Sequence, residues 1–176
     1  GLDLNKNFKI IDIESFNANY RNNKKILNKL NLKKDNSNFA INGESFDASG
    51  IINNIMDSNK VSSSFFPNLK TKIKIKLKKT YIDDINYINN LYGNINFANS
   101  KLDDLELKAT FPNSKKINLS IKTNSNSETI TRLFSAYPKP LIKRYDFIKG
   151  FEEGHMDFYS TKKGDVSNSI LIIDNF

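Results

Sequence analysis

The chain has 176 residues, which is enough for one sizeable domain and too few for two ordinary ones. Only 38% of the residues are hydrophobic and tryptophan is absent, so a one-sided or elongated sheet fits better than a thick globule. The absence of cysteine excludes disulfides, thiol catalysis and cysteine-ligated zinc, and no run of about 18 apolar residues is present that could span a membrane.

The net charge is +8, with 27 basic and 19 acidic residues. An anionic partner, either nucleic acid or a phospholipid surface, is one interpretation. The other is a compositional bias towards Asn, Lys and Ile, which we favour because arginine, the side chain best suited to phosphates and base edges, occurs at only three positions. We therefore expect nucleic acid to be an unlikely partner.

In the first half of the chain, alternating apolar and polar residues predict strands over 8–13, 26–33 and 39–41. Residues 47–57 carry aliphatic side chains at helical spacing after Asp47, a plausible N-cap, and predict a short amphipathic helix. The clearest element is 69–77, L-K-T-K-I-K-I-K-L, in which lysine occupies every even position. Because successive side chains of a strand point to opposite faces, this segment predicts a strand with one apolar and one charged face.

In the second half, strands are expected over 92–97, 105–111 and 117–121, and the last two form a hairpin around Pro112. Residues 125–137 show apolar side chains at i, i+3, i+4 and i+7, with Ser125 and Glu128 spaced as a capping box, and predict a second short helix. Pro138 and Pro140 would end that helix. A final hairpin is expected from strands over 155–161 and 169–173.

These elements predict a mainly β fold: a curved antiparallel sheet, as an open groove or half-barrel, with two short amphipathic helices. We expect residues 1–176 to form a single β-rich domain with two weak strand–helix–strands repeats, over about 38–111 and 115–176. The chain begins with Gly1 and stops inside the apolar run I-L-I-I-D-N-F, so we expect a fragment of a longer protein.

No feature of the sequence points to catalysis. The single histidine, His155, opens a candidate strand and has no histidine or cysteine partner for nucleophile activation or metal binding. The adjacent acidic pairs are 83–84, 103–104 and 152–153, and neighbouring carboxylates on a strand face opposite ways. Phosphate-binding, nucleophile-elbow and zinc-protease motifs are absent. We therefore expect no enzymatic activity, no cofactor and no metal.

The two faces of the predicted sheet suggest different roles. The lysines of 69–78 are best explained as a solvated face, because no aromatic side chains are interleaved for base stacking. The apolar face either packs as an ordinary half-covered core, closes on itself, or meets a partner or ligand. The candidate groove-facing residues are Ile73, Ile75, Leu77, Leu105, Leu107, Phe111, Ile117, Leu119 and Ile121.

The order of these blocks resembles the AsmA-like family of envelope proteins across roughly residues 39–176. The stretch N-G-E-S-F-D-A-S-G-I-I-N-N-I (42–55) is similar to a strand and helix of that family, and F-P-N-L-K-T-K-I-K-I-K-L (66–77) to the alternating strand that follows. Further similar blocks are 90–109, S-E-T-I-T-R-L-F-S-A-Y (127–137), Y-D-F-I-K-G-F-E-E-G-H-M-D-F (145–158) and I-L-I-I-D-N-F (170–176). The chain departs from the family at 151–153, where paired glycines are usual.

The resemblance implies a periplasmic segment of a protein anchored in the inner membrane of a Gram-negative bacterium. It further implies a non-catalytic, membrane-associated role in outer membrane biogenesis, in which phospholipid moves between inner and outer membrane along an apolar β-groove. The expected partners are phospholipid acyl chains, held along the nine residues given above, and the remainder of the parent chain. The alternative is a structural or assembly module that binds an envelope protein or a neighbouring repeat by β-strand addition.

Overall fold

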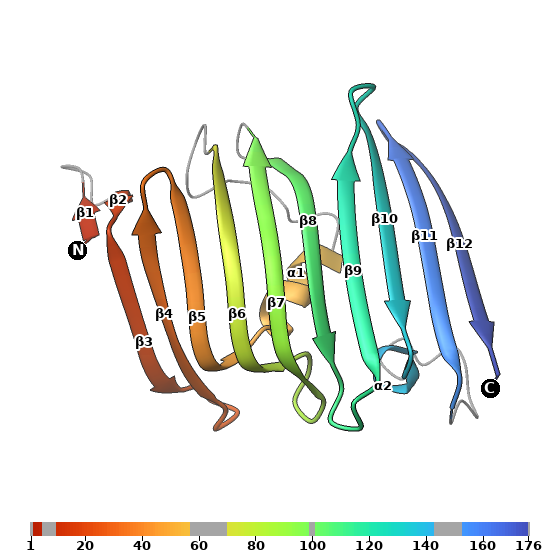
Figure 1. Cartoon of the computed structure of the whole chain (residues 1–176), viewed down its shortest axis with the longest axis horizontal. Helices are drawn as coiled ribbons and strands as arrows, with labels where there is room; N and C mark the ends of the chain where they lie inside the picture. Colours follow the sequence, from red (N-terminus) through yellow and green to blue (C-terminus); the bar gives the residue numbers. More distant parts are fainter. Residues whose placement is uncertain (1, 5–9, 57–69, 99–100, 143–152, 176) are drawn as a thin grey trace.

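The computed structural model describes residues 2–4, 10–56, 70–98, 101–142 and 153–175. Its main feature is one broad, open sheet of ten strands in the order β12-β11-β10-β9-β8-β7-β6-β5-β4-β3 (Figure 1). A separate two-stranded sheet pairs β1 (Leu2–Leu4) with β2 (Ile10–Ile13). The predicted mainly β class, with an unclosed sheet and two short helices, is therefore confirmed.

The strands of the main sheet follow one another across the sheet in chain order. They are β3 (Ser15–Arg21), β4 (Leu27–Asp35), β5 (Asn38–Asp47), β6 (Thr71–Tyr81), β7 (Tyr87–Ala98), β8 (Lys101–Thr110), β9 (Lys116–Thr123), β10 (Glu128–Ser135), β11 (His155–Lys163) and β12 (Val166–Asp174). Predicted residues 8, 9, 57 and 69, each at an end of an expected element, lie outside the described part of the chain.

All neighbouring strands of this sheet are antiparallel except β5 and β6, which are parallel. A parallel pair needs a crossover connection between its strands. Helix α1 (Ser49–Met56) lies in that connection, so the sheet is mixed rather than purely antiparallel. By contrast, the chain passes through α2 (Lys139–Ile142) between the antiparallel strands β10 and β11. The two-repeat organisation stays a prediction.

The first predicted helix is confirmed as α1, whose first turn is closed by a hydrogen bond from the N–H of Ile52 to the carbonyl of Ala48. Asp47, the expected N-cap, lies one residue before that position and bonds to the start of the helix with its side chain. Asp47 Oδ1 accepts a hydrogen bond from the backbone N–H of Ser49 at 3.0 Å, and Oδ2 accepts one from Asn22 Nδ2 at 2.7 Å. Partial burial acts to raise the pKa of Asp47, but these hydrogen bonds, with the charge of Lys24, hold it below its usual value. The carboxylate thus links the β5–α1 junction to the turn between β3 and β4.

The second predicted helix, over 125–137, is wrong. Most of that segment forms strand β10, which pairs with β9 and β11 in unbroken register. Its Thr129 and Thr131 are β-branched and favour an extended backbone. The helical spacing of apolar residues arose because a strand inside a sheet can place apolar side chains on both faces, with Leu133 on one and Ile130 and Phe134 on the other.

The two prolines expected to end that helix instead begin a helical turn. Residues 139–142 form α2, in which the backbone N–H groups of Leu141 and Ile142 donate to the carbonyl of Pro138. Proline is tolerated at the start of a helix because the first N–H groups have no partner within the helix. The position of α2 follows from this start signal.

Both predicted hairpins are confirmed. Strands β8 and β9 pair around the turn that contains Pro112, and the N–H of Ser114 donates to the carbonyl of Phe111. Strands β11 and β12 pair across a short turn in which Gly164 has a φ of 57°. Glycine adopts this left-handed backbone without strain, which fits the tight reversal.

The buried core lies at the end of the sheet to which the helices pack. One cluster joins Ile82, Ile88, Ala109 and Phe111 with Ile52 of α1 and Leu141 of α2. A second joins Ile142 of α2 and Met156 with Leu133 and Ile173. Figure 1 shows both helices behind the sheet, so they cover the same face.

Candidate functional site

One face of the sheet carries an unbroken line of paired residues across all ten strands. We call this line the central row, and it consists, from β3 to β12, of Phe16, Leu32, Ile41, Ile75, Gly93, Leu107, Leu119, Leu133, Phe158 and Leu171. Directly paired residues point to the same face of a sheet. Every member except Gly93 has an apolar side chain, so the central row defines an apolar face as wide as the sheet.

The predicted groove-facing residues of β6, β8 and β9 all lie on this apolar face. Ile75, Leu107 and Leu119 belong to the central row, and a neighbouring row pairs Ile73, Ile95, Leu105 and Ile121. Six of the nine predicted side chains are half-buried, namely Ile73, Ile75, Leu107, Ile117, Leu119 and Ile121. The other three, Leu77, Leu105 and Phe111, are buried, at 4%, 8% and 1% exposure.

Sequence reasoning missed the outer members of the central row. Phe16 on β3 and Leu171 on β12 are 52% and 43% exposed, and Leu133 and Phe158 are half-buried. The segment F-N-A-N-Y at 16–20 alternates in the same way as β6 and could have revealed β3. Leu133 was not assigned to the apolar face of a sheet because residues 125–137 were predicted to form a helix.

The opposite face, which we call the polar face, carries the even-numbered lysines of β6. Lys72, Lys74 and Lys76 are exposed and stand opposite Asn96, Asn94 and Tyr92 of β7. Exposed lysines are typical of a solvated face, and on a sheet they also discourage aggregation. Over β6, this face is therefore a charged, solvent-exposed sheet surface.

A few ion pairs and amide contacts order the polar face. Glu106 and Lys108 of β8 form an ion pair at 2.6 Å, and their hydrogen bond lowers the pKa of Glu106 and raises the pKa of Lys108. Asn96 Nδ2 donates to Asp104 Oδ2 at 3.0 Å. Surface pairs of this kind add little stability, so the polar face contributes mainly solubility.

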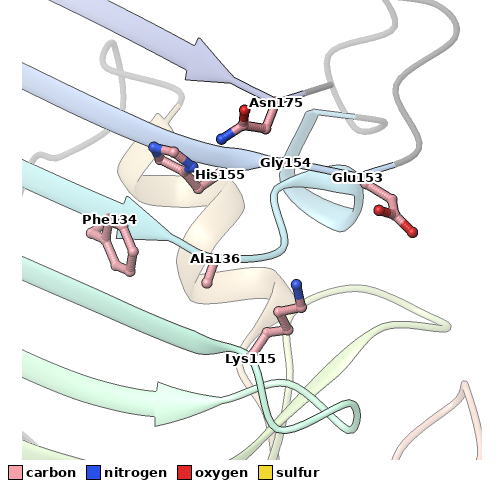
Figure 2. Close-up of a pocket in the computed structure, with 7 residues that line it drawn as sticks. All are labelled: Lys115, Phe134, Ala136, Glu153, Gly154, His155 and Asn175. Carbon is pink, nitrogen blue, oxygen red and sulfur yellow. The ribbon is translucent and has the colours of Figure 1, made fainter.

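Two hollows open on the polar face near the last strands. One, of about 410 Å³, is lined by Lys115, Phe134, Ala136, Glu153, Gly154, His155 and Asn175 (Figure 2). The other, of about 310 Å³, lies over β10–β12 and includes Phe134, Tyr159, Ile170 and Ile172 among its lining residues. None of the nine predicted groove-facing residues lines either hollow.

The lone histidine lines the first hollow, beside the end of β12. His155 Nε2 is 3.3 Å from Asp174 Oδ2, and its ring lies 6.4 Å, centroid to centroid, from the ring of Phe134. The described residues that line this hollow include no serine, threonine or cysteine that could act as a nucleophile. The contact between His155 and Asp174 joins the start of β11 to the end of β12.

The first acidic pair, Asp83 and Asp84, has structural partners. Asp83 Oδ1 accepts hydrogen bonds from the backbone N–H groups of Ile85 and Asn86, and Asp84 pairs with Lys24 at 2.5 Å. The hydrogen bond from Lys24 to Asp84 raises the pKa of that lysine. Among the described residues, no three His, Cys, Asp or Glu side chains gather closely enough to hold a metal ion, and Glu152 lies outside them.

Among the helices of the described segments, none has the length and apolar character needed to cross a membrane. No protein-family model, curated protein or solved structure matches this chain. The assignment of a function therefore depends on the apolar face itself.

Proposed function

We propose that this chain is a non-catalytic lipid-binding segment of an AsmA-like protein, and that phospholipid acyl chains lie along its apolar face. In this proposal the parent protein is anchored in the inner membrane of a Gram-negative bacterium, and the sheet is a periplasmic part of the path to the outer membrane. The observation that carries the proposal is the central row, which offers apolar side chains on nine of ten consecutive strands.

The dimensions of the apolar face favour movement along it rather than capture at one point. Nine spacings of about 4.8 Å between ten neighbouring strands make the central row roughly 43 Å long. The hydrocarbon of one bilayer leaflet is only about 15 Å thick, being half of a core of about 30 Å. An acyl chain can thus occupy successive positions along the row, each offering a similar gain of about 0.8 kcal/mol per buried methylene.

The lipid-contacting role belongs to the half-buried members of the predicted set. Ile75, Leu107 and Leu119 in the central row, with Ile73 and Ile121 beside it, keep part of their surface accessible. Phe111 lies in the core cluster with Ile82 and Ile88 and packs edge-on against Tyr137, at 5.4 Å between ring centroids. We therefore assign Phe111 to the core that holds the helices on the sheet.

The first test uses adjacent residues on opposite faces. We expect Ile75→Asn to weaken transfer of a fluorescent phospholipid from phosphatidylethanolamine–phosphatidylglycerol vesicles to the purified chain by at least about tenfold, because an amide must then be desolvated within the row. The matched Lys74→Asn variant, on the polar face, should transfer lipid as the wild type does. Equal transfer by Ile75→Asn and wild type, with both folded by circular dichroism, would contradict the proposal.

A second measurement locates the lipid directly, using the absence of natural tryptophan in the chain. A tryptophan introduced as Ile75→Trp should lose fluorescence when brominated-chain phospholipid replaces ordinary phospholipid, because bromine quenches only a ring in contact with the acyl chain. Lys74→Trp should be insensitive to the replacement. Similar quenching at both positions would place the lipid elsewhere and overturn the proposal.

A further inference from the structure

The apolar face changes its chemistry along strands β10–β12, and the central row is the boundary. On the side of α2, the next row pairs Ser135, Met156 and Ile173, and Met156 packs with Ile142 of α2. On the other side, the next two rows carry only hydroxyl side chains and one lysine. Figure 1 shows α2 at the lower end of these strands and the β9–β10 and β11–β12 turns at the upper end. We call the hydroxyl-bearing residues of these two rows the hydroxyl patch, which consists of Thr129, Thr131, Ser160, Ser167 and Ser169.

Strands β6–β9 do not show this change beside the central row. The row that contains Thr131 and Ser160 continues across them as Ile121, Leu105, Ile95 and Ile73. Between β6 and β12, the row next to the central row is therefore aliphatic on four strands and hydroxyl-bearing on three. A lipid on the apolar face would meet polar side chains beside the central row over β10–β12.

Lys162 gives the hydroxyl patch a positive charge. It is exposed, and it pairs with Thr129 on β10 and Ser167 on β12. The acidic residues of these three strands, Glu128, Asp157 and Asp174, belong to the rows of the polar face. An anionic group on the apolar face would thus meet Lys162 without competition from a carboxylate of β10–β12.

The serines of the hydroxyl patch can donate to a further acceptor. Ser169 Oγ donates to Ser160 Oγ at 2.9 Å, and Ser160 and Ser167 share a hydrogen bond at 3.2 Å. Three hydroxyls carry three O–H donors, and these two bonds use two of them. At least one O–H therefore points beyond this group of three. A phosphate oxygen is a strong acceptor for such a donor, and a lysine beside it supplies the opposite charge.

The distances along β11 fit the length of one acyl chain. Lys162 lies four residues from Phe158 of the central row and six residues from Met156, which is about 13 and 20 Å at about 3.3 Å per residue. The hydrocarbon of one bilayer leaflet is about 15 Å thick. A phospholipid with its phosphate at Lys162 would therefore extend its acyl chains across the central row and end them before the buried Met156.

The reverse orientation of the lipid is unfavourable at both ends. Acyl chains over the hydroxyl patch would remove its hydroxyls and the ammonium group of Lys162 from water without giving them new polar partners. The charged headgroup would at the same time lie beside the hydrophobic cluster of Met156 and Ile142. Only the orientation with the headgroup away from α2 matches polar groups with polar groups.

We propose that the hydroxyl patch and Lys162 bind the phosphate-bearing headgroup of a phospholipid whose acyl chains extend along β10–β12, across the central row and towards α2. This placement rests on the proposed function, which puts acyl chains on the apolar face. It adds the orientation of the lipid and the residues that recognise its phosphate. A lipid without phosphate would keep the contacts of its acyl chains and lose those of its headgroup.

The first test reverses the charge of neighbouring lysines on opposite faces of β11. Lys162 and Lys163 are both exposed, and Lys163 pairs with Glu128 on the polar face. Lys162→Glu should weaken transfer of fluorescent phosphatidylglycerol from vesicles to the full chain by about tenfold, because a charge-assisted contact becomes a repulsion. Its transfer of fluorescent diacylglycerol, which has no phosphate, should equal that of the wild type.

The Lys163→Glu variant carries the same change of net charge and should transfer both lipids as the wild type does. Circular dichroism should be the same for both variants and the wild type. Equal losses of phosphatidylglycerol transfer in the two variants would overturn the inference, because the face would then not matter. Equal losses of both lipids in Lys162→Glu would overturn it as well, because the phosphate would then not be recognised.

The orientation is tested by single tryptophans on β12, four residues or about 13 Å apart on the same face. Ser167→Trp should be quenched by phospholipid with a nitroxide on its headgroup, and Leu171→Trp by phospholipid brominated near its chain ends. The reverse pattern, or equal quenching at both positions, would overturn the inference and leave lipid on the apolar face. Absence of quenching at both positions would overturn the proposed function as well.

Discussion

Gly93 is the one member of the central row without a side chain, and the close approach of β8 leaves no room for one. It has a φ of 154°, and a Cβ atom placed on it would lie 1.8 Å from the carbonyl oxygen of Glu106 on β8. No side-chain rotation relieves a clash with backbone, so we expect Gly93→Ala to force β7 and β8 apart. The expected loss is about 1–3 kcal/mol in the free energy of unfolding, measured by urea denaturation.

Gly50 provides the matched control for this substitution. It lies in helix α1, and a Cβ atom placed on it would meet nothing within 4 Å. Gly50→Ala should therefore leave stability unchanged or raise it by up to about 1 kcal/mol, since alanine is the better helix former. Equal destabilisation by the two substitutions would show that the close approach of β7 and β8 at Gly93 does not determine the outcome.

At the scale of elements, the segment 124–135 shows how the β9–β10 hairpin differs from the predicted helix. Asn124 Oδ1 accepts hydrogen bonds from the backbone N–H groups of Asn126 and Glu128, at 2.9 and 3.0 Å, and Ser127 has a φ of 57°. Asn124 thus organises the turn, while Ser125, the expected helix cap, is exposed. An asparagine that bonds its own following backbone is a common basis of tight turns.

This difference gives an element-scale prediction. Asn124→Ala should lower the free energy of unfolding by about 1 kcal/mol, because two backbone N–H groups lose their acceptor. Ser125→Ala should change it by less than about 0.5 kcal/mol. Thermal denaturation of both variants checks the pair. If the segment were a capped helix, the order would reverse, and Ser125→Ala would cost about 0.5–2 kcal/mol.

The elements that could be predicted from sequence are those whose pattern allows only one backbone. In β6, strict alternation of lysine with Ile73, Ile75 and Leu77 fits a strand and no helix. In β10, apolar residues occupy both faces, and the same spacing fits either element. The parallel pairing of β5 with β6 depends on the course of the connection through α1, which local periodicity does not encode.

The candidate site was predictable only as isolated residues. Alternation identified which side chains of β6, β8 and β9 share a face within each strand, and those assignments agree with the pairing. The central row, however, depends on the register of nine strand pairs, including a bulge in β7 where Asn90 has a φ of 52°. A single one-residue slip would have moved a strand's apolar side chains to the polar face.

For the whole molecule, the uneven distribution of the core predicts uneven stability along the strands. Ile88 and Ala109 are buried in the cluster that α1 and α2 join, whereas Ile95 and Ile121, farther along β7 and β9, are only half-buried. Backbone amides exchange with solvent through local opening, which is easier where fewer apolar groups are buried. We therefore expect slower amide hydrogen exchange at Ile88 and Ala109 than at Ile95 and Ile121.

Phospholipid should reduce this difference in exchange rate by slowing exchange only at the strand ends that lie away from the helices. Acyl chains on the apolar face would bury the half-exposed side chains, and any ligand that binds the folded state alone stabilises the regions it covers. Adding phosphatidylethanolamine–phosphatidylglycerol vesicles should slow exchange at Ile95 and Ile121 while leaving Ile88 and Ala109 nearly unchanged. The Ile75→Asn variant should lose this protection and Lys74→Asn should keep it. Protection spread evenly over both ends, or confined to the helix-covered end, would contradict binding along the central row.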